Sequence, residues 1–252
     1  MERFAVADIE SKLFWTAGFF VVVGPSGSGK TTIVRNALAN PRKYIALPET
    51  GATLWVLVGA SHDLQKELEP ELNRSVFTAA HFVTEHLSEC DDLRSAVENN
   101  NNGGAHVIFI DDYMSYSNRD SDFIKQLLHR YKRHERLCVV VAVHNLKCDQ
   151  PRTRIVGEML DFADRVIFTK SHLNLSNLKL YLQRINFPLL ARSSLRREFL
   201  ADRNLPPEKK RYGILVHDRK STYVISDFVA LLDGADQNKM YCYGESIVSA
   251  QD

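Results

Sequence analysis

Short apolar runs recur along the chain and are separated by polar or helix-like stretches. They lie at residues 19–23, 55–58, 107–110, 138–143 and 166–168, with a weaker candidate at 44–47. Apolar runs of this length, without alternating polar positions, are typical of strands buried on both faces of a parallel sheet. Two further runs, 212–217 and 222–226, flank a polar turn at 218–221 and predict a hairpin.

Apolar residues at helical spacing fill much of the intervals between these runs. We predict helices at 31–38, 78–97, 122–134 and 173–185, the first ending before Asn40 and Pro41. Strands that alternate with helices predict an α/β fold: a doubly wound, mostly parallel sheet with helices on both faces. The hairpin adds an antiparallel edge near the C-terminus. No linker rich in Pro, Gly or Ser divides the chain, and 98–104 has the composition of a surface loop, so residues 1–252 are predicted to form one domain.

A glycine-rich loop follows the strand at 19–23 directly. Residues 24–31 read Gly-Pro-Ser-Gly-Ser-Gly-Lys-Thr and fit the phosphate-loop spacing G-x-x-x-x-G-K-[ST]. Glycines let backbone N–H groups surround phosphates without Cβ clashes, and the following helix adds the positive end of its dipole. The motif predicts a P-loop NTPase that binds ATP and Mg²⁺, with Lys30 on the β- and γ-phosphates and Thr31 on Mg²⁺. The predicted nucleotide-binding residues are Gly24, Pro25, Ser26, Gly27, Ser28, Gly29, Lys30, Thr31 and Thr32.

Two carboxylates end the strand at 107–110. In P-loop NTPases, an acid in this place holds Mg²⁺, and a second acid orients and deprotonates the attacking water. We assign the first role to Asp111 and the second to Asp112. Apolar runs that end in acids also occur as helix caps or turns. The phosphate loop upstream favours the catalytic interpretation.

The strand at 138–143 ends in His144 and Asn145. In P-loop ATPases with an additional central strand, the tip of that strand faces the γ-phosphate, so either side chain is a candidate sensor of hydrolysis. The alternative for His144 is a loop histidine with a local hydrogen bond. Basic residues upstream either form a solvated helix end or include an arginine finger for a neighbouring subunit; they are Arg130, Lys132, Arg133 and Arg136.

Charge is distributed unevenly along the sequence. The whole chain holds 32 Lys and Arg against 31 Asp and Glu, a net charge of +1. Segment 119–220 contains 22 basic and 11 acidic residues, which leaves 10 basic and 20 acidic residues for the remainder. A basic segment of this kind is either a chance unevenness of solvated surface or an electrostatic footprint for a polyanion.

The remaining composition excludes several classes of protein. The four cysteines are widely spaced and form no Cys-x-x-Cys pair, which argues against a zinc ribbon or a disulfide framework and fits reduced thiols. The longest apolar run, 13–23, is too short to span a membrane. The first residues lack the basic region of a signal peptide. We therefore expect a soluble protein that is not secreted and has no membrane span.

The order of the motifs resembles that of a known superfamily. GPSGSGKT is followed by IFIDD, KRHERLCVVVAVHN and FADRVIFTK, and then by a hairpin with Tyr-Gly-Ile-Leu-Val. This order resembles the FtsK/HerA-type P-loop DNA translocases. Within them, the chain resembles the poxvirus-type genome-packaging ATPases of large DNA viruses, virophages and Polinton-like elements, over residues 19–228.

The resemblance implies a function and partners. It implies an ATP-hydrolysing motor, built as a ring-shaped homo-oligomer, that translocates double-stranded DNA into a preformed capsid. The partners would then include capsid or portal vertex proteins, and the location would be virus assembly sites inside the host cell, with the virion as a second location. The candidate contacts to DNA phosphates, with a solvated face as the alternative, are Arg192, Arg196, Arg197, Lys209, Lys210 and Arg211.

The resemblance also bears on two site residues. In the superfamily, an arginine at about the distance of Arg133 from the sensor strand acts in trans, which makes Arg133 the preferred finger. The family usually has a glutamine at the strand tip, where this sequence has His144, whose imidazole can also donate a hydrogen bond to phosphate. The alternatives to a packaging motor are a small-molecule or nucleotide kinase, a regulatory nucleotide-binding module and another DNA-directed ATPase.

Overall fold

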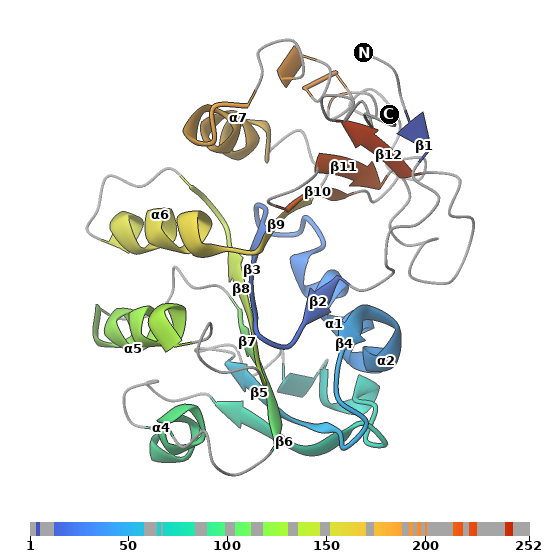
Figure 1. Ribbon diagram of the computed structural model, residues 1–252, viewed down its shortest axis with the longest axis vertical. Coiled ribbons are helices and arrows are strands. Elements are labelled where there is room, and N and C mark those ends of the chain that lie inside the picture. The colour runs from blue at the N-terminus through green and yellow to red at the C-terminus, as the bar shows by residue number, and fades with distance from the viewer. Residues whose placement is uncertain are drawn as a thin grey trace, which may run out of the picture.

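The computed structural model of the chain places most of its strands in one large sheet (Figure 1). It describes residues 4–5, 13–57, 65–66, 68–83, 90–98, 104–111, 118–130, 136–146, 152–169, 174–187, 192–193, 196–197, 200, 214–218, 222–225 and 240–243. The order of neighbouring strands in the large sheet is β1-β12-β11-β10-β9-β3-β8-β7-β5-β6, and β2 pairs with β4 in a separate small sheet.

Each predicted apolar run coincides with a strand, but the strands at 4–5, 14–15, 77–83 and 240–243 were not predicted. Those of the small sheet are β2 (Phe14–Trp15) and β4 (Ile45–Ala46). Those of the large sheet are β1 (Phe4–Ala5), β3 (Gly18–Val23), β5 (Ala52–Leu57), β6 (Phe77–Val83), β7 (Ala105–Ile110), β8 (Leu137–Val143), β9 (Arg165–Thr169), β10 (Ile214–Asp218), β11 (Thr222–Ile225) and β12 (Met240–Tyr243).

The large sheet has a parallel part and an antiparallel part. Neighbouring strands from β9 through β3, β8, β7 and β5 to β6 run parallel. Strands β10, β11, β12 and β1 continue the sheet beyond β9 in antiparallel pairing. The predicted C-terminal hairpin is therefore confirmed as β10–β11, and the antiparallel edge extends further than the sequence indicated.

Helices cover both faces of the parallel part, as predicted (Figure 1). The helices α1 and α2 lie on one face, and α4, α5 and α6 lie on the other. The described helices are α1 (Lys30–Ala39), α2 (Pro41–Tyr44), the 3₁₀ turn η1 (Glu69–Glu71), α4 (Asp91–Glu98), α5 (Asn118–Arg130), α6 (Arg152–Phe162) and α7 (Leu175–Arg184). None of them is both long enough and apolar enough to cross a membrane.

Two hydrophobic cores lie on the two faces of the sheet. Alternate side chains of β3 enter different cores, with Val21 facing α4–α7 and Val22 facing α1. Every residue of β3 and of β8 is buried. This burial on both faces explains why these strands read as continuous apolar runs rather than as alternating patterns.

One prediction was wrong over part of its length. The segment 78–97 was expected to be a helix, but β6 (Phe77–Val83) pairs in parallel with β5, and of the residues described in this segment those of α4 (Asp91–Glu98) are helical. The apolar residues at both ends of β6 fit the spacing of a helix as well as that of a strand, so pairing with β5 decided the structure. The helix α6 was not predicted, since its β-branched residues and Gly157 weaken the helical signal.

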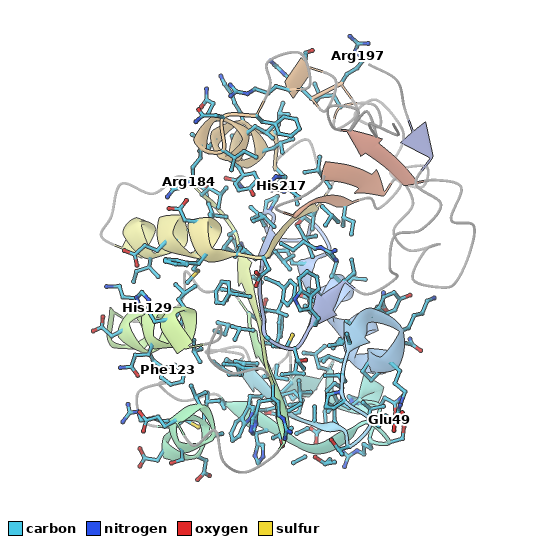
Figure 2. All side chains as sticks on the ribbon, in the orientation of Figure 1. Glu49, Phe123, His129, Arg184, Arg197 and His217 are labelled. Carbon is cyan, nitrogen blue, oxygen red and sulfur yellow. The ribbon has the colours of Figure 1, made fainter. Side chains whose placement is uncertain are left out.

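An ion pair connects helix α7 to helix α6. The Arg184 guanidinium donates to both carboxylate oxygens of Asp161 and, over 3.2 Å, to the carbonyl of Gly157 (Figure 2). The hydrogen bond to Asp161 raises the pKa of Arg184. Because both side chains are partly exposed, this pair contributes little to the free energy of unfolding.

Candidate nucleotide-binding site

The topology of the parallel sheet marks one crevice at its carboxyl edge. After β3 the chain passes through α1 on one face and continues to β5, whereas after β8 it passes through α6 on the other face and reaches β9. Connections that depart in opposite directions from two adjacent parallel strands leave a crevice outside their carboxyl ends. That crevice lies between the ends of β3 and β8.

The glycine-rich loop occupies the β3 side of this crevice. It connects β3 to α1, and two of its glycines have left-handed backbone conformations, Gly27 at φ 70° and Gly29 at φ 94°. The Ser28 N–H donates to the Pro25 carbonyl over 3.2 Å and closes the turn. Side chains with a Cβ adopt such φ values only with strain, so the loop requires glycine there.

Gly24 is required for a different reason, which is lack of space. A Cβ on Gly24 would collide with the hydroxyl groups of Thr169 and Ser28. The Thr169 Oγ1 lies 2.9 Å from the Ser28 Oγ, so β9 contacts the loop through this pair of hydroxyls. The start of the loop is therefore packed against β9 as well as against β8.

Lys30 is buried at the N-terminus of α1. Its side chain is 5% exposed, and its ammonium donates to the carbonyl oxygens of Gly24 at 2.7 Å and Pro25 at 3.0 Å. A buried cation at the positive end of a helix dipole creates an electrostatic environment that favours an anion. The loop carbonyls hold this ammonium close to the glycines.

His144 lies directly beside the loop. The register pairs Val23 with Val143, and the Gly24 N–H donates to the Val143 carbonyl over 3.0 Å. The residue that follows β8 is then His144, which is half-buried, and Asn145 after it is exposed. The structure therefore places His144 beside the phosphate loop, with Asn145 as the next residue of the strand tip.

Asp111 follows β7, on the far side of β8 from the loop. Ile110 pairs with Val141, so Asp111 lies level with Ala142 at the same edge of the sheet. It is partly exposed, and its N–H donates to the Leu57 carbonyl over 3.0 Å. Asp112 and Arg133 lie outside the described residues.

Sequence reasoning missed three side chains at this edge of the sheet. Thr169, Asn174 and Asn177 are buried beside the loop and the strand tip. Thr169 directly follows the apolar run at 166–168, in the same relation to its run as Asp111 and His144 to theirs. That position was the one available signal, since the two asparagines come from the start of α7.

The residues at the crevice fit a nucleoside triphosphate with Mg²⁺. The left-handed glycines, the crowding at Gly24 and the buried cation of Lys30 match what a phosphate-cradling loop needs. Oxygen donors suited to Mg²⁺ are present on Thr31, in the first turn of α1, and on Asp111. The decisive feature is the strand order, in which β8 is inserted between the loop strand β3 and the acidic strand β7.

The fold is that of a P-loop NTPase with an additional central strand. The sequence matches no protein-family model and no curated protein. One similar solved structure is the genome packaging NTPase B204 from Sulfolobus turreted icosahedral virus 2 in complex with AMPPCP, at TM-score 0.47 and 13% identity over 81% of this chain and 93% of that one.

Two longer solved structures are similar over part of their length. EssC (ATPases 2 and 3) from Geobacillus thermodenitrificans matches at TM-score 0.43 and 11% identity, over 60% of this chain and 32% of that one. EccC (ATPases 2 and 3) from Thermomonospora curvata, in complex with a signal sequence peptide, matches at TM-score 0.41 and 15% identity, over 63% of this chain and 34% of that one. Because these TM-scores and identities are low, the assignment of the fold is based on the strand order and the loop geometry and not on the similar structures.

We predict that Gly24→Ala destabilises the protein through collision with Thr169 and Ser28. A clash of this kind in a packed region costs about 1–3 kcal/mol of unfolding free energy, measurable by urea unfolding. Adding Thr169→Ala to Gly24→Ala should recover part of the loss, because it removes one of the two colliding side chains. Equal stability of Gly24→Ala and the wild type would show that the loop is not packed against β9.

Proposed function

We propose that this chain is an ATP-hydrolysing motor that translocates double-stranded viral DNA into a preformed capsid. The observation that carries the proposal is the position of His144, at the end of the inserted strand β8, between the phosphate loop and the acidic strand end. A polar strand tip in this place is suited to detect loss of the γ-phosphate, as a motor that couples hydrolysis to movement requires. The resemblance in motif order supplies the DNA-packaging part of the proposal.

Each residue of the site has a role in this proposal. The Lys30 ammonium leaves the loop carbonyls and contacts the β- and γ-phosphates when ATP binds. Thr31 and Asp111 would hold Mg²⁺, which when bound neutralises charge on the phosphate oxygens. Asp112 orients the attacking water and accepts its proton. Arg133 reaches the γ-phosphate of a neighbouring subunit, and His144 or Asn145 responds to its loss.

The basic segment 119–220 supports an interaction with DNA. A translocase must hold phosphates without reading bases, and clustered Lys and Arg side chains do so. Of the candidates described, Arg196 and Arg197 are exposed, and Figure 2 shows Arg197 extending from the outside of the molecule. Arg192 is less suited, because its Nε donates to the Phe187 carbonyl over 2.6 Å. Lys209, Lys210 and Arg211 lie outside the described residues.

The organisation of the sheet supports one ATPase domain over residues 1–252. The same sheet contains β1 near the N-terminus and β12 near the C-terminus. We further propose a ring-shaped homo-oligomer that docks on capsid or portal vertex proteins at virus assembly sites in the host cell, with the virion as a second location.

We predict that DNA of any sequence stimulates ATP hydrolysis by the purified chain. Linear double-stranded DNA should raise turnover, and added salt should weaken the stimulation because it competes with phosphate contacts. Lys30→Ala serves as the blank and should lower kcat at least about 100-fold, as loss of one key charge-stabilising donor does. Turnover indifferent to DNA, or phosphate transfer to a small acceptor, would favour a regulatory module or a kinase instead.

Asp112→Asn should separate nucleotide binding from hydrolysis. The amide keeps the size of the side chain but cannot accept the proton of water, so kcat should fall while affinity for Mg²⁺-ATP stays within about twofold. Binding of a fluorescent ATP analogue and phosphate release measure the two quantities. Loss of binding in this variant would identify Asp112 as a metal ligand or a structural residue.

Two inactive variants should restore each other if Arg133 acts in trans. A Lys30→Ala subunit retains the finger, and an Arg133→Ala subunit retains the phosphate loop, so a mixed ring regains turnover at interfaces that combine them. The control mixes Arg133→Ala with a Lys30→Ala, Arg133→Ala double variant, which should stay inactive. Mixtures that show no gain over either variant alone would exclude the trans role.

A further inference from the structure

Buried polar side chains gather at the phosphate-loop edge of the sheet. In the part of the chain that the structure describes, the buried polar or charged residues are Lys30, Arg165, Thr169, Asn174 and Asn177, and four of these five lie at this edge. All except Arg165 contact the loop, the strand tips beside it or each other. Burying an amide is unfavourable unless its hydrogen bonds are made, so two buried asparagines here require an explanation.

Asn174 links the ends of two strands on one side of the crevice. Its Nδ2 donates to the Val23 carbonyl over 2.9 Å and to the Thr169 carbonyl over 3.0 Å, which uses both of its N–H groups. Val23 is the last residue before the phosphate loop, and Thr169 ends β9. Asn174 stands at the N-cap of α7, but its side chain makes no capping hydrogen bond there. A residue type suited to capping is used instead to join β3 to β9.

Asn177 holds the tip of β8. Its Nδ2 donates to the His144 carbonyl over 3.2 Å, and its Oδ1 accepts from the Leu146 N–H over 2.9 Å. These two bonds enclose Asn145 and replace the backbone partners that a neighbouring strand would have offered. A side chain of α7 therefore contacts the backbone on both sides of Asn145.

The two asparagines also bind each other. The second N–H of Asn177 donates to the Asn174 Oδ1 over 2.9 Å, so all four amide N–H groups have acceptors. A continuous buried path then runs from the Val23 carbonyl, through Asn174 and Asn177, to His144 and Leu146. This path joins the carboxyl ends of β3 and β8 without passing through the sheet.

We propose that Asn177 is a positioning residue for ATP hydrolysis, which keeps the turn 144–146 in register with the phosphate loop through Asn174. The inference rests on the proposed function, because it assigns the turn a role at the γ-phosphate. The helix α7 has a hydrophobic anchor of its own in Leu178, Tyr181 and Leu182, so docking of α7 does not require the asparagines. The asparagines instead restrain the backbone of residues 144–146 at the strand tip.

The test compares Asn177→Leu with the wild type. Leucine is close to asparagine in size and has a high helix propensity, so this change removes the hydrogen bonds and retains most of the packing. In DNA-stimulated hydrolysis, kcat should fall about tenfold or more, because small displacements of a catalytic constellation are costly, while KM for ATP stays within about twofold. The Leu146 N–H should also exchange with solvent faster, as measured by hydrogen exchange.

Tyr181→Phe is the matched control on the same helix. The Tyr181 hydroxyl lies 2.6 Å from the His217 Nδ1, on β10, and its loss removes a partly buried hydrogen bond that connects α7 to β10 rather than to the strand tip. This variant should lower thermal stability and keep kcat within about twofold. An equal fall of kcat in both variants would reduce Asn177 to a structural role and overturn the inference.

The outcomes separate this inference from the proposed function. A wild-type chain that binds ATP without hydrolysing it overturns the proposed function. A wild-type chain that hydrolyses ATP, together with Asn177→Leu at unchanged kcat, overturns the positioning role alone. If Asn177→Leu does not fold, Asn174→Ser replaces it, since serine is smaller than asparagine and its single O–H donor cannot reproduce both donations. Its kcat should fall by about threefold or more, by the same misplacement argument, and wild-type kcat there would reject the inference.

Discussion

The pairing of β3 with β8 is the constraint on which the site depends. In this register, Val23 lies opposite Val143, and the Gly24 N–H bonds to the Val143 carbonyl. A shift of one residue would send the side chains of β8 into the opposite cores and move His144 away from the loop. Since every residue of both strands is buried, such a shift would also displace packed side chains on two faces. The free-energy cost of that displacement fixes the register.

Close packing around the loop limits which residues can occupy it. Gly24 has no room for a Cβ because the hydroxyls of Thr169 and Ser28 meet there, whereas Gly27 and Gly29 are set by backbone conformation. The glycines of the loop are therefore required for two separate physical reasons, which are lack of space at the first and a left-handed backbone at the other two. Lys30 joins the loop to α1 through the carbonyls of Gly24 and Pro25, and these contacts leave the ammonium close to where phosphates would bind.

The helix α7 links the nucleotide site to the antiparallel part of the sheet. At its start, Asn174 and Asn177 contact β3, β8 and β9, and one turn later Tyr181 contacts His217 of β10. Burial raises the pKa of the Tyr181 hydroxyl, with a smaller contribution from the charge of Asp161. Arg184 then ties the end of the helix to α6. A single rigid element therefore touches the strand tip and the C-terminal hairpin.

The sequence by itself determined the central strands and the phosphate loop. Strands buried on both faces leave uninterrupted apolar runs, and a phosphate loop needs particular residues at short, fixed spacing; both are local requirements. The sequence did not determine β6, which was predicted as part of a helix, because its ends suit either period and only pairing with β5 decides between them. Thr169, Asn174 and Asn177 also emerged only from the tertiary structure. The partners that place them at the site, Ser28, Val23 and His144, lie far away in the chain, and hydrogen bonds across such separations leave no periodic trace in a single sequence.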